Sequence, residues 1–364
     1  MFRARLKSHL QGVLISMVVM WCAIGGAAAV IAQDETPSLF TLLSPDPVVP
    51  HGNRGAFDDR YTDPGAAVYN PQDGLFHMFR NGFRAWPGVV QIQHMTSPDA
   101  ITWTADPAEP VIHTGDTPFP AATVLASSVL IEPDGTWVLY FYTLANLRPG
   151  IIASGSIGRA TAADPAGPWT IDSQPVLTPG STGEWDSGQV TAPCVLRNED
   201  GSYTMFYAAL SVDSPARRIG MATSMDGITW TKYNDPDTTA APYADSDPVF
   251  APLAEGDWDG ADVTQPRVQW DSDHGYTMVY RGQADLRTPS MNIGLATSPD
   301  GLHWSPYANN PVLTLSEMPA SQFWYTATAA REDTTYLFIE FAAPGNKTSI
   351  WATSVTGALP PDGH

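Results

Sequence analysis

Three carboxylates stand where paired acid–base chemistry is possible: Asp63, Asp262 and Glu340. Asp63 and Asp262 begin apolar segments, and Glu340 ends one. Cleavage of a glycosidic bond needs a protonated carboxyl at the leaving oxygen and an ionised one that faces the anomeric carbon or its water. Structural alternatives exist, because residues 62–65 (Thr-Asp-Pro-Gly) also suit a tight turn, and Glu340 could form a salt bridge with Arg80.

Cationic and aromatic side chains in the same segments could bind a polar ligand. Arginine can hold hydroxyls or a carboxylate through two parallel hydrogen bonds, and an aromatic ring can stack on a sugar face or simply pack between sheets. The candidates are Arg80, Arg267, Arg281, Trp86, Trp324 and Tyr325. The sequence has no phosphate-cradling glycine loop, no serine nucleophile elbow and no metal-ligand spacing of histidines, so we expect neither a metal nor a cofactor.

A phrase of alternating residues recurs along the chain. Ile-Gly-x-Ala-Thr-Ser, or a close variant, begins at Ile92, Ile157, Ile219, Ile293 and Ile350. An Asp-Gly turn and a tryptophan follow the third and fourth copies, and a turn with an apolar strand precedes each copy. Alternation around such turns is typical of β-hairpins.

The repeat predicts an all-β, five-bladed β-propeller with four-stranded blades, because four short strands recur in each unit of about 70 residues. The fifth unit lacks the Asp-Gly hairpin, whereas residues 47–49 (Pro-Val-Val) stand alone near the N-terminus. We expect this N-terminal segment to complete the last blade, which removes an open sheet edge. The predicted boundaries are a signal peptide or anchor over 1–32, a linker over 33–46, the propeller over 47–357 and a tail over 358–364.

Long loops on one face of such a propeller are the expected binding region, because short hairpins are structural and irregular loops carry function. These loops span residues 81–88, 143–155, 209–218, 282–291 and 342–348. Asp58, Asp186 and Asp259 each follow an aromatic residue at one register, which indicates a structural role.

Composition and the N-terminus indicate the compartment. A net charge of −20 excludes binding to a phosphate backbone. A basic start followed by an apolar run over residues 12–32 is typical of a secretory signal, or of an uncleaved anchor. Cys194 is the only cysteine after this run, so no internal disulfide can form. The alanine-rich, lysine-poor composition is typical of bacteria, and we expect a secreted or extracytoplasmic protein.

Asp63-Pro64 at the first inner strand, with the order Ala-Thr-Ser, Asp-Gly, Trp and Pro-Val that is complete in the third and fourth units, resembles the five-bladed glycosidase superfamily. That group includes glycoside hydrolase families 43, 32, 68 and 130. The resemblance implies that Asp63 is the base or nucleophile and that a glutamate on the third blade is the acid. Thr191 stands at that acid position, so Asp262 or Glu340 must supply the acid. We expect Thr191 and Gln265, on the third and fourth blades, to contact the ligand.

The sequence therefore predicts a secreted, glycosidase-like enzyme that acts on an oligo- or polysaccharide. One alternative is a non-catalytic carbohydrate-binding protein, which Thr191 at the acid position favours. The other is a secreted propeller that serves as a scaffold for protein interactions. The expected partner is a saccharide; we expect no nucleic acid, no membrane beyond the signal or anchor segment, and a monomer.

Overall fold

The computed structural model describes residues 38–148, 152–287, 291–318, 321–343 and 347–360. The expected signal or anchor segment over 1–32 lies outside these residues. No helix within the described ranges is long and apolar enough to span a membrane. Two short 3₁₀ helices, η1 (Thr114–Asp116) and η2 (Leu315–Glu317), accompany a structure that is otherwise built from β-strands.

The strands of the described residues form five antiparallel meanders, numbered here in chain order. The first contains β2 (Tyr61–Asn70), β3 (Leu75–Phe83), β4 (Val90–Ser97) and β5 (Thr104–Ala105), with β6 (Ile112–His113) added to β4. The second contains β7 (Thr123–Ile131), β8 (Trp137–Ala145), β9 (Ser154–Ala162) and β10 (Thr170–Ile171). The third contains β11 (Gln189–Arg197), β12 (Tyr203–Ser211), β13 (Ser214–Ser224) and β14 (Thr231–Lys232), with β15 (Pro248–Phe250) added to β13. The fourth contains β16 (Asp262–Asp271), β17 (Gly275–Gln283), β18 (Met291–Ser298) and β19 (Ser305–Pro306). The fifth contains β20 (Gln322–Arg331), β21 (Thr334–Ala343), β22 (Lys347–Thr356) and β1 (Thr41–Leu42).

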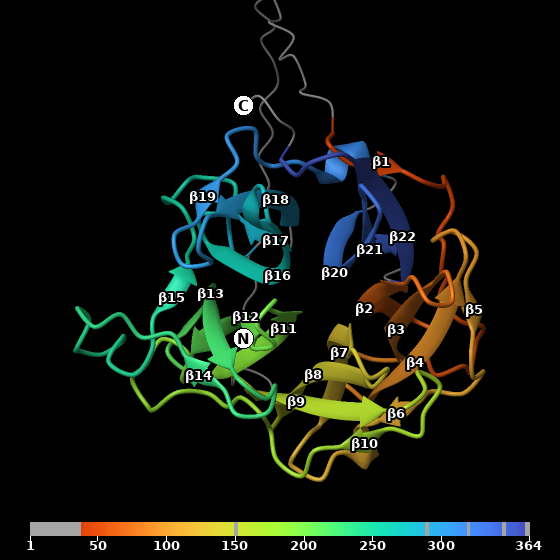
Figure 1. Cartoon of the computed structure of the whole chain (residues 1–364), viewed down its shortest axis with the longest axis horizontal. Helices are drawn as coiled ribbons and strands as arrows, with labels where there is room; N and C mark the ends of the chain where they lie inside the picture. Colours follow the sequence, from red (N-terminus) through yellow and green to blue (C-terminus); the bar gives the residue numbers. More distant parts are fainter. Residues whose placement is uncertain (1–37, 149–151, 288–290, 319–320, 344–346, 361–364) are drawn as a thin grey trace, which may run out of the picture. The chain divides into compact units, whose positions relative to one another are not determined.

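The meanders form a ring. Their first strands contact one another in the cyclic order β2, β7, β11, β16, β20 and back to β2. Figure 1 shows these five strands innermost, with the later strands of each meander further out. A single parallel pairing of Gly155 with Gln189 joins the second and third meanders into one nine-stranded sheet. The predicted all-β propeller is thus confirmed.

The N-terminal segment closes this ring, as the sequence predicts. Thr41 pairs with Ser354 on β22, which makes β1 the outer strand of the fifth meander. Val49 forms a further antiparallel bridge with Ile350. The fifth meander therefore includes Thr41–Leu42, which the sequence analysis assigned to the linker over 33–46, because short strands leave little periodicity to read.

Apolar side chains gather between consecutive meanders rather than in one central core. One cluster, for example, joins Phe206 and Ile219 of the third meander to Met278 of the fourth. Four similar clusters fill the other gaps. The repeated Ile-Gly phrase follows from this packing, since a Cβ on Gly294 would lie 2.6 Å from the Trp258 ring. Each blade is thus held mainly by its two neighbours.

Candidate active site

Irregularities in the inner strands shape the centre of the ring. The ladder between the first two strands shifts register at residues 63–66, 191–194, 264–267 and 323–326, with a smaller shift at 126–128. Such β-bulges re-aim side chains and are frequent near active sites. In β2 the bulge requires glycine, because Gly65 has a φ of +54° and a Cβ there would lie 2.1 Å from the Phe79 carbonyl oxygen.

Two adjoining clefts open at this end of the strands. The main cleft has a volume of about 900 Å³ and is lined by bulge residues such as Thr191 and Gln265 and by the loops after the second strands. The second cleft has a volume of about 300 Å³ and is lined on one side by Glu340. Trp86, Trp324 and Tyr325 line both clefts, so the two are continuous along these aromatic side chains.

Asp63 is completely buried and, like Asp262, does not itself line either cleft. Its Oδ1 accepts hydrogen bonds from the Gly65 backbone N–H at 2.8 Å and from Asn81 Nδ2 at 2.7 Å. Its Oδ2 has no hydrogen-bond partner among the described residues. Burial raises the pKa of Asp63 to about 7, although the two hydrogen bonds and the positive charge of Arg267 oppose the rise. Asp63 is therefore partly protonated at neutral pH, and one of its oxygens is buried without a partner among the described residues.

Glu340 is the second buried carboxyl, with only 2% of its surface exposed. Burial, and then the negative charge of Asp63, raise the pKa of Glu340 well above its usual value. Hydrogen bonds from the Thr348 hydroxyl and the Tyr325 backbone oppose that rise, while Oε2 has no partner in the described part of the chain. The structure thus brings together two of the three predicted carboxylates, and their ionisation is linked.

Glu340 occupies a position that recurs in the other meanders, where a different residue stands and makes structural contacts. Like Arg80, Tyr207 and Tyr280, it stands opposite the bulge of its inner strand. Arg80 binds Asp58 at 2.5 Å, and the Tyr280 hydroxyl donates to Asp259 at 2.8 Å. Tyr207 lies beside Asp186, which also binds Lys232 at 2.5 Å. These contacts agree with a structural role for the repeated aspartates.

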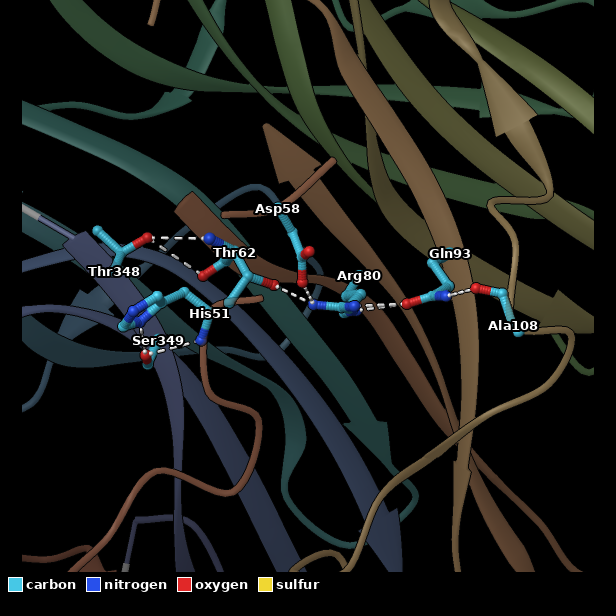
Figure 2. A network of polar contacts seen from close by, with 8 residues as sticks. All are labelled: His51, Asp58, Thr62, Arg80, Gln93, Ala108, Thr348 and Ser349. Atoms are coloured by element: carbon cyan, nitrogen blue, oxygen red, sulfur yellow. Dashed lines mark hydrogen bonds and ion pairs between the residues drawn. The ribbon is translucent and has the colours of Figure 1, made fainter. Parts of the chain in front are cut away.

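Arg80 serves this structural network rather than a ligand. Its guanidinium bonds Asp58, Gln93 and the Thr62 hydroxyl, the last at 3.0 Å, as Figure 2 shows. Thr348 Oγ1 accepts from the Thr62 backbone N–H at 3.0 Å. Arg80 therefore fixes the residue next to Asp63. The alternative salt bridge between Glu340 and Arg80 is wrong, because Asp58 lies closer along the same meander and takes the guanidinium.

Asp262, the third predicted carboxylate, is occupied by Arg217. Its Oδ1 accepts from the Arg217 backbone N–H at 2.6 Å, and its Oδ2 lies 3.2 Å from Arg217 Nη1. Asp262 lines neither of the two clefts, whereas Arg217 lines the main one. The geometry makes Asp262 a positioning residue for Arg217.

Arg267 braces the centre of the ring below the clefts. It is buried and donates to the backbone oxygens of Thr326 at 2.7 Å and Ser127 at 3.0 Å. These contacts join the second, fourth and fifth meanders. Its charge opposes the rise in the pKa of Asp63, so Arg267 acts electrostatically on that carboxyl, and it does not line the main cleft.

The other predicted binding residues do line the clefts. Arg281, Thr191 and Gln265 line the main cleft, while Trp86, Trp324 and Tyr325 line both. Gln265 Oε1 accepts from the Thr326 backbone N–H at 2.8 Å, which fixes its side chain. Trp86 is 44% exposed and is therefore free to meet a ligand.

Sequence reasoning missed Tyr142, which lines the main cleft and whose hydroxyl lies beside that of Tyr325. No signal in the sequence separated it from the neighbouring core aromatics of β8. The long loop predicted over 209–218 is instead a tight turn, because Ser211 pairs directly with Ser214. No group of three or more His, Cys, Asp or Glu side chains within the described ranges is arranged to hold a metal ion.

Comparisons with known proteins show the fold. No protein-family model and no curated protein sequence matches the chain. A solved structure described as a glycoside hydrolase is 15% identical, with a TM-score of 0.65 over 90% of this chain and 94% of that one. A glycosyl hydrolase from Bacteroides ovatus is 14% identical, with a TM-score of 0.63 over 86% and 93%. A third structure represents the GH130 family of mannoside phosphorylases, described as containing hydrolases of beta-1,2 mannosidic linkages in Candida mannan; it is 15% identical, with a TM-score of 0.61 over 88% and 94%. The chain has the β-propeller fold of these glycosidases.

Proposed function

We propose that the protein is an exported, carbohydrate-active enzyme that cleaves or transfers glycosidic bonds in an oligo- or polysaccharide. The observation that carries this proposal is the pair of buried carboxyls, Asp63 and Glu340, whose ionisation is linked and each of which has one unpartnered oxygen. The structural neighbours, which are described as glycoside hydrolases, support the same reaction class.

The two carboxyls suit different roles. Glu340 lines the second cleft and favours its protonated form, since burial and the charge of Asp63 both raise its pKa. It is therefore the general acid that protonates the leaving oxygen. Asp63, with a pKa of about 7, supplies the ionised carboxylate as base or nucleophile. Trp86 and Trp324 line both clefts, so a sugar that spans the clefts can stack on these rings.

A second candidate function is carbohydrate binding without catalysis. Asp63 has no exposed surface, and Thr191 stands where the resemblance places the acid. A catalytic Asp63 requires the side chains beside it, which include Tyr142 and Tyr325, to move when substrate enters. A binding protein needs no such opening.

Hydrolysis of a panel of aryl-glycosides and oligosaccharides tests the proposal. General acid–base groups contribute about 10²- to 10⁴-fold to rate, so Asp63→Asn and Glu340→Gln should each lower kcat/KM by at least about 100-fold on any substrate that is turned over. Asp213→Asn, the same chemical change at an exposed residue, is the matched control. Saccharide binding without turnover by the unaltered protein favours the binding function, and equal turnover by all variants removes the pair from the mechanism.

A further inference from the structure

The main cleft differs in charge from the protein that surrounds it. The chain carries 38 acidic and 18 basic residues, yet the described lining of this cleft contains no Asp or Glu. Its charged residues are Arg148, Arg217, Arg281 and Arg287, of which Arg217 and Arg287 form ion pairs with Asp262 and Asp285. The undescribed residues 149–151 and 288–290, which adjoin two of these arginines in the sequence, include no carboxylate either.

Among these four arginines, Arg281 gives the strongest indication of an anion-binding site. Its side chain is buried, with the residue only 6% exposed, and Nη1 donates to the Trp324 carbonyl oxygen. Nε has no hydrogen-bond partner, and no carboxylate lies within ion-pair distance of the guanidinium in the part of the chain that the structure describes. A buried cation without a direct counter-ion is costly, so a site of this kind favours an incoming anion.

Other donors converge on the same place from different meanders. Arg217, from β13, lies close enough to Arg281 for the two charges to repel each other. Asp262 binds Arg217 through its backbone N–H and Nη1, and Nη2 makes no hydrogen bond within the described residues. The hydroxyls of Tyr142, from β8, and Tyr325, from β20, lie beside both guanidiniums. We call Arg217, Arg281, Tyr142 and Tyr325 the arginine–tyrosine cluster.

We infer that the cluster binds the anionic group of an acidic sugar residue, such as the carboxylate of a uronic acid or a sulfate ester. Guanidinium groups match planar or tetrahedral anionic oxygens with paired hydrogen bonds, and the buried phenols add neutral donors. The cleft lacks carboxylates, which would accept hydrogen bonds from the hydroxyls of a neutral sugar. Arg148 is exposed at the same cleft, where its charge attracts anions from solution. This inference rests on the proposed function and names its substrate class.

Binding to the unaltered full-length protein provides the test, by titration calorimetry with tri-galacturonic acid, its methyl ester, glucose 6-sulfate, glucose and inorganic phosphate. A hydrogen bond to a charged group contributes enough for at least about a tenfold change in Kd. We expect the acid to bind at least about tenfold more tightly than its methyl ester, or the sulfated sugar than glucose, and added salt to weaken the binding. Which acidic probe binds identifies the anion.

Variants locate the anion in the cleft. Arg281→Gln should weaken binding of the acidic sugar about tenfold and leave the ester unchanged, whereas the exposed control Arg54→Gln should change neither. Thermal unfolding first checks that Arg281→Gln folds; if it does not, the comparison of acid with ester still decides. Equal affinity for acid and ester, binding of phosphate alone, or binding of no acidic probe overturns the inference. The proposed function survives these outcomes if a neutral glycoside is hydrolysed, and both fail if no saccharide binds or reacts.

Discussion

Replacing Asp63 by asparagine should make the protein more stable at neutral pH. Asparagine has nearly the same shape, and its side-chain oxygen can keep both hydrogen bonds that Oδ1 now accepts, from Gly65 and Asn81. What disappears is the cost of ionising a carboxyl that has no exposed surface. Since Oδ2 has no partner in the described structure, the change breaks no further contact.

The sign and size of the effect follow from the pKa. Folding raises the pKa of Asp63 from 3.8 to about 7, so the folded state binds the proton more tightly than the unfolded state. The contribution of Asp63 to the free energy of unfolding is therefore fully present below pH 4 and is lost as the pH rises through 7. A shift of about three pKa units, at 1.36 kcal/mol each, corresponds to about 4 kcal/mol. The quantity to compare is the unfolding free energy of Asp63→Asn minus that of the wild type. This difference should be larger at pH 8 than at pH 4 by up to this amount.

Urea denaturation followed by tryptophan fluorescence between pH 4 and pH 8 measures this difference. The net charge of −20 makes both proteins depend on pH through general repulsion, so the quantity of interest is the difference between the two curves. Asp213→Asn, at an exposed loop position, should run parallel to the wild type. Parallel curves for Asp63→Asn as well would refute the argument that burial holds this carboxyl protonated.

Three further predictions concern other parts of the site and fold. If Asp63 acts in its ionised form, kcat/KM on any hydrolysed glycoside should rise as the pH passes about 7, and a flat profile between pH 5 and pH 8 contradicts that role. Arg80→Met should lower the unfolding free energy by roughly 3–5 kcal/mol, measured by chemical denaturation, because it leaves Asp58 buried without its partner. An unchanged value would show that the ion pair between Arg80 and Asp58 does not stabilise the fold. Gly294→Ala should cost about 1–3 kcal/mol in thermal unfolding, since the new Cβ collides with the Trp258 ring, whereas Gly74→Ala has open space and tests the cost of its positive φ alone.

The sequence predicted the fold well because the repeat is a packing rule. Three features recur from blade to blade, and each makes its own contact in every blade that has it. They are the Ile-Gly phrase, the Asp-Gly turn and the aromatic residue before Asp58, Asp186 and Asp259. Repeated local contacts of this kind can be recognised from a single sequence. The proximity of Asp63 and Glu340 was harder to predict. It depends on the contact between the fifth meander and the first, which lie at opposite ends of the sequence.

The predictions for Arg80, Arg267 and Asp262 show a different limit. Each of these charged residues was proposed as a site residue, and each is engaged by protein atoms: Asp58 binds Arg80, Thr326 and Ser127 bind Arg267, and Arg217 binds Asp262. The sequence shows that a charged residue stands in an apolar segment. It does not show whether another residue of the fold already binds that charge. Arg281 differs from Arg267 in that its Nε has no hydrogen-bond partner among the described residues and its side chain lines the main cleft.

Both carboxyls depart from the repeat at the place where the ring closes. The bulge position of Asp63 is threonine in the third and fourth meanders and phenylalanine in the fifth. The position of Glu340 is arginine or tyrosine in three other meanders, where it contacts or lies beside the repeated aspartate that the fifth meander lacks. Packing alone would be satisfied by repeating the common residues, and two buried carboxyls in linked ionisation make the closed ring less stable at neutral pH. Both carboxyls flank the contact between Thr62 and Thr348, where the first and fifth meanders meet. The catalytic role that we propose for the pair explains why the chain keeps this cost there.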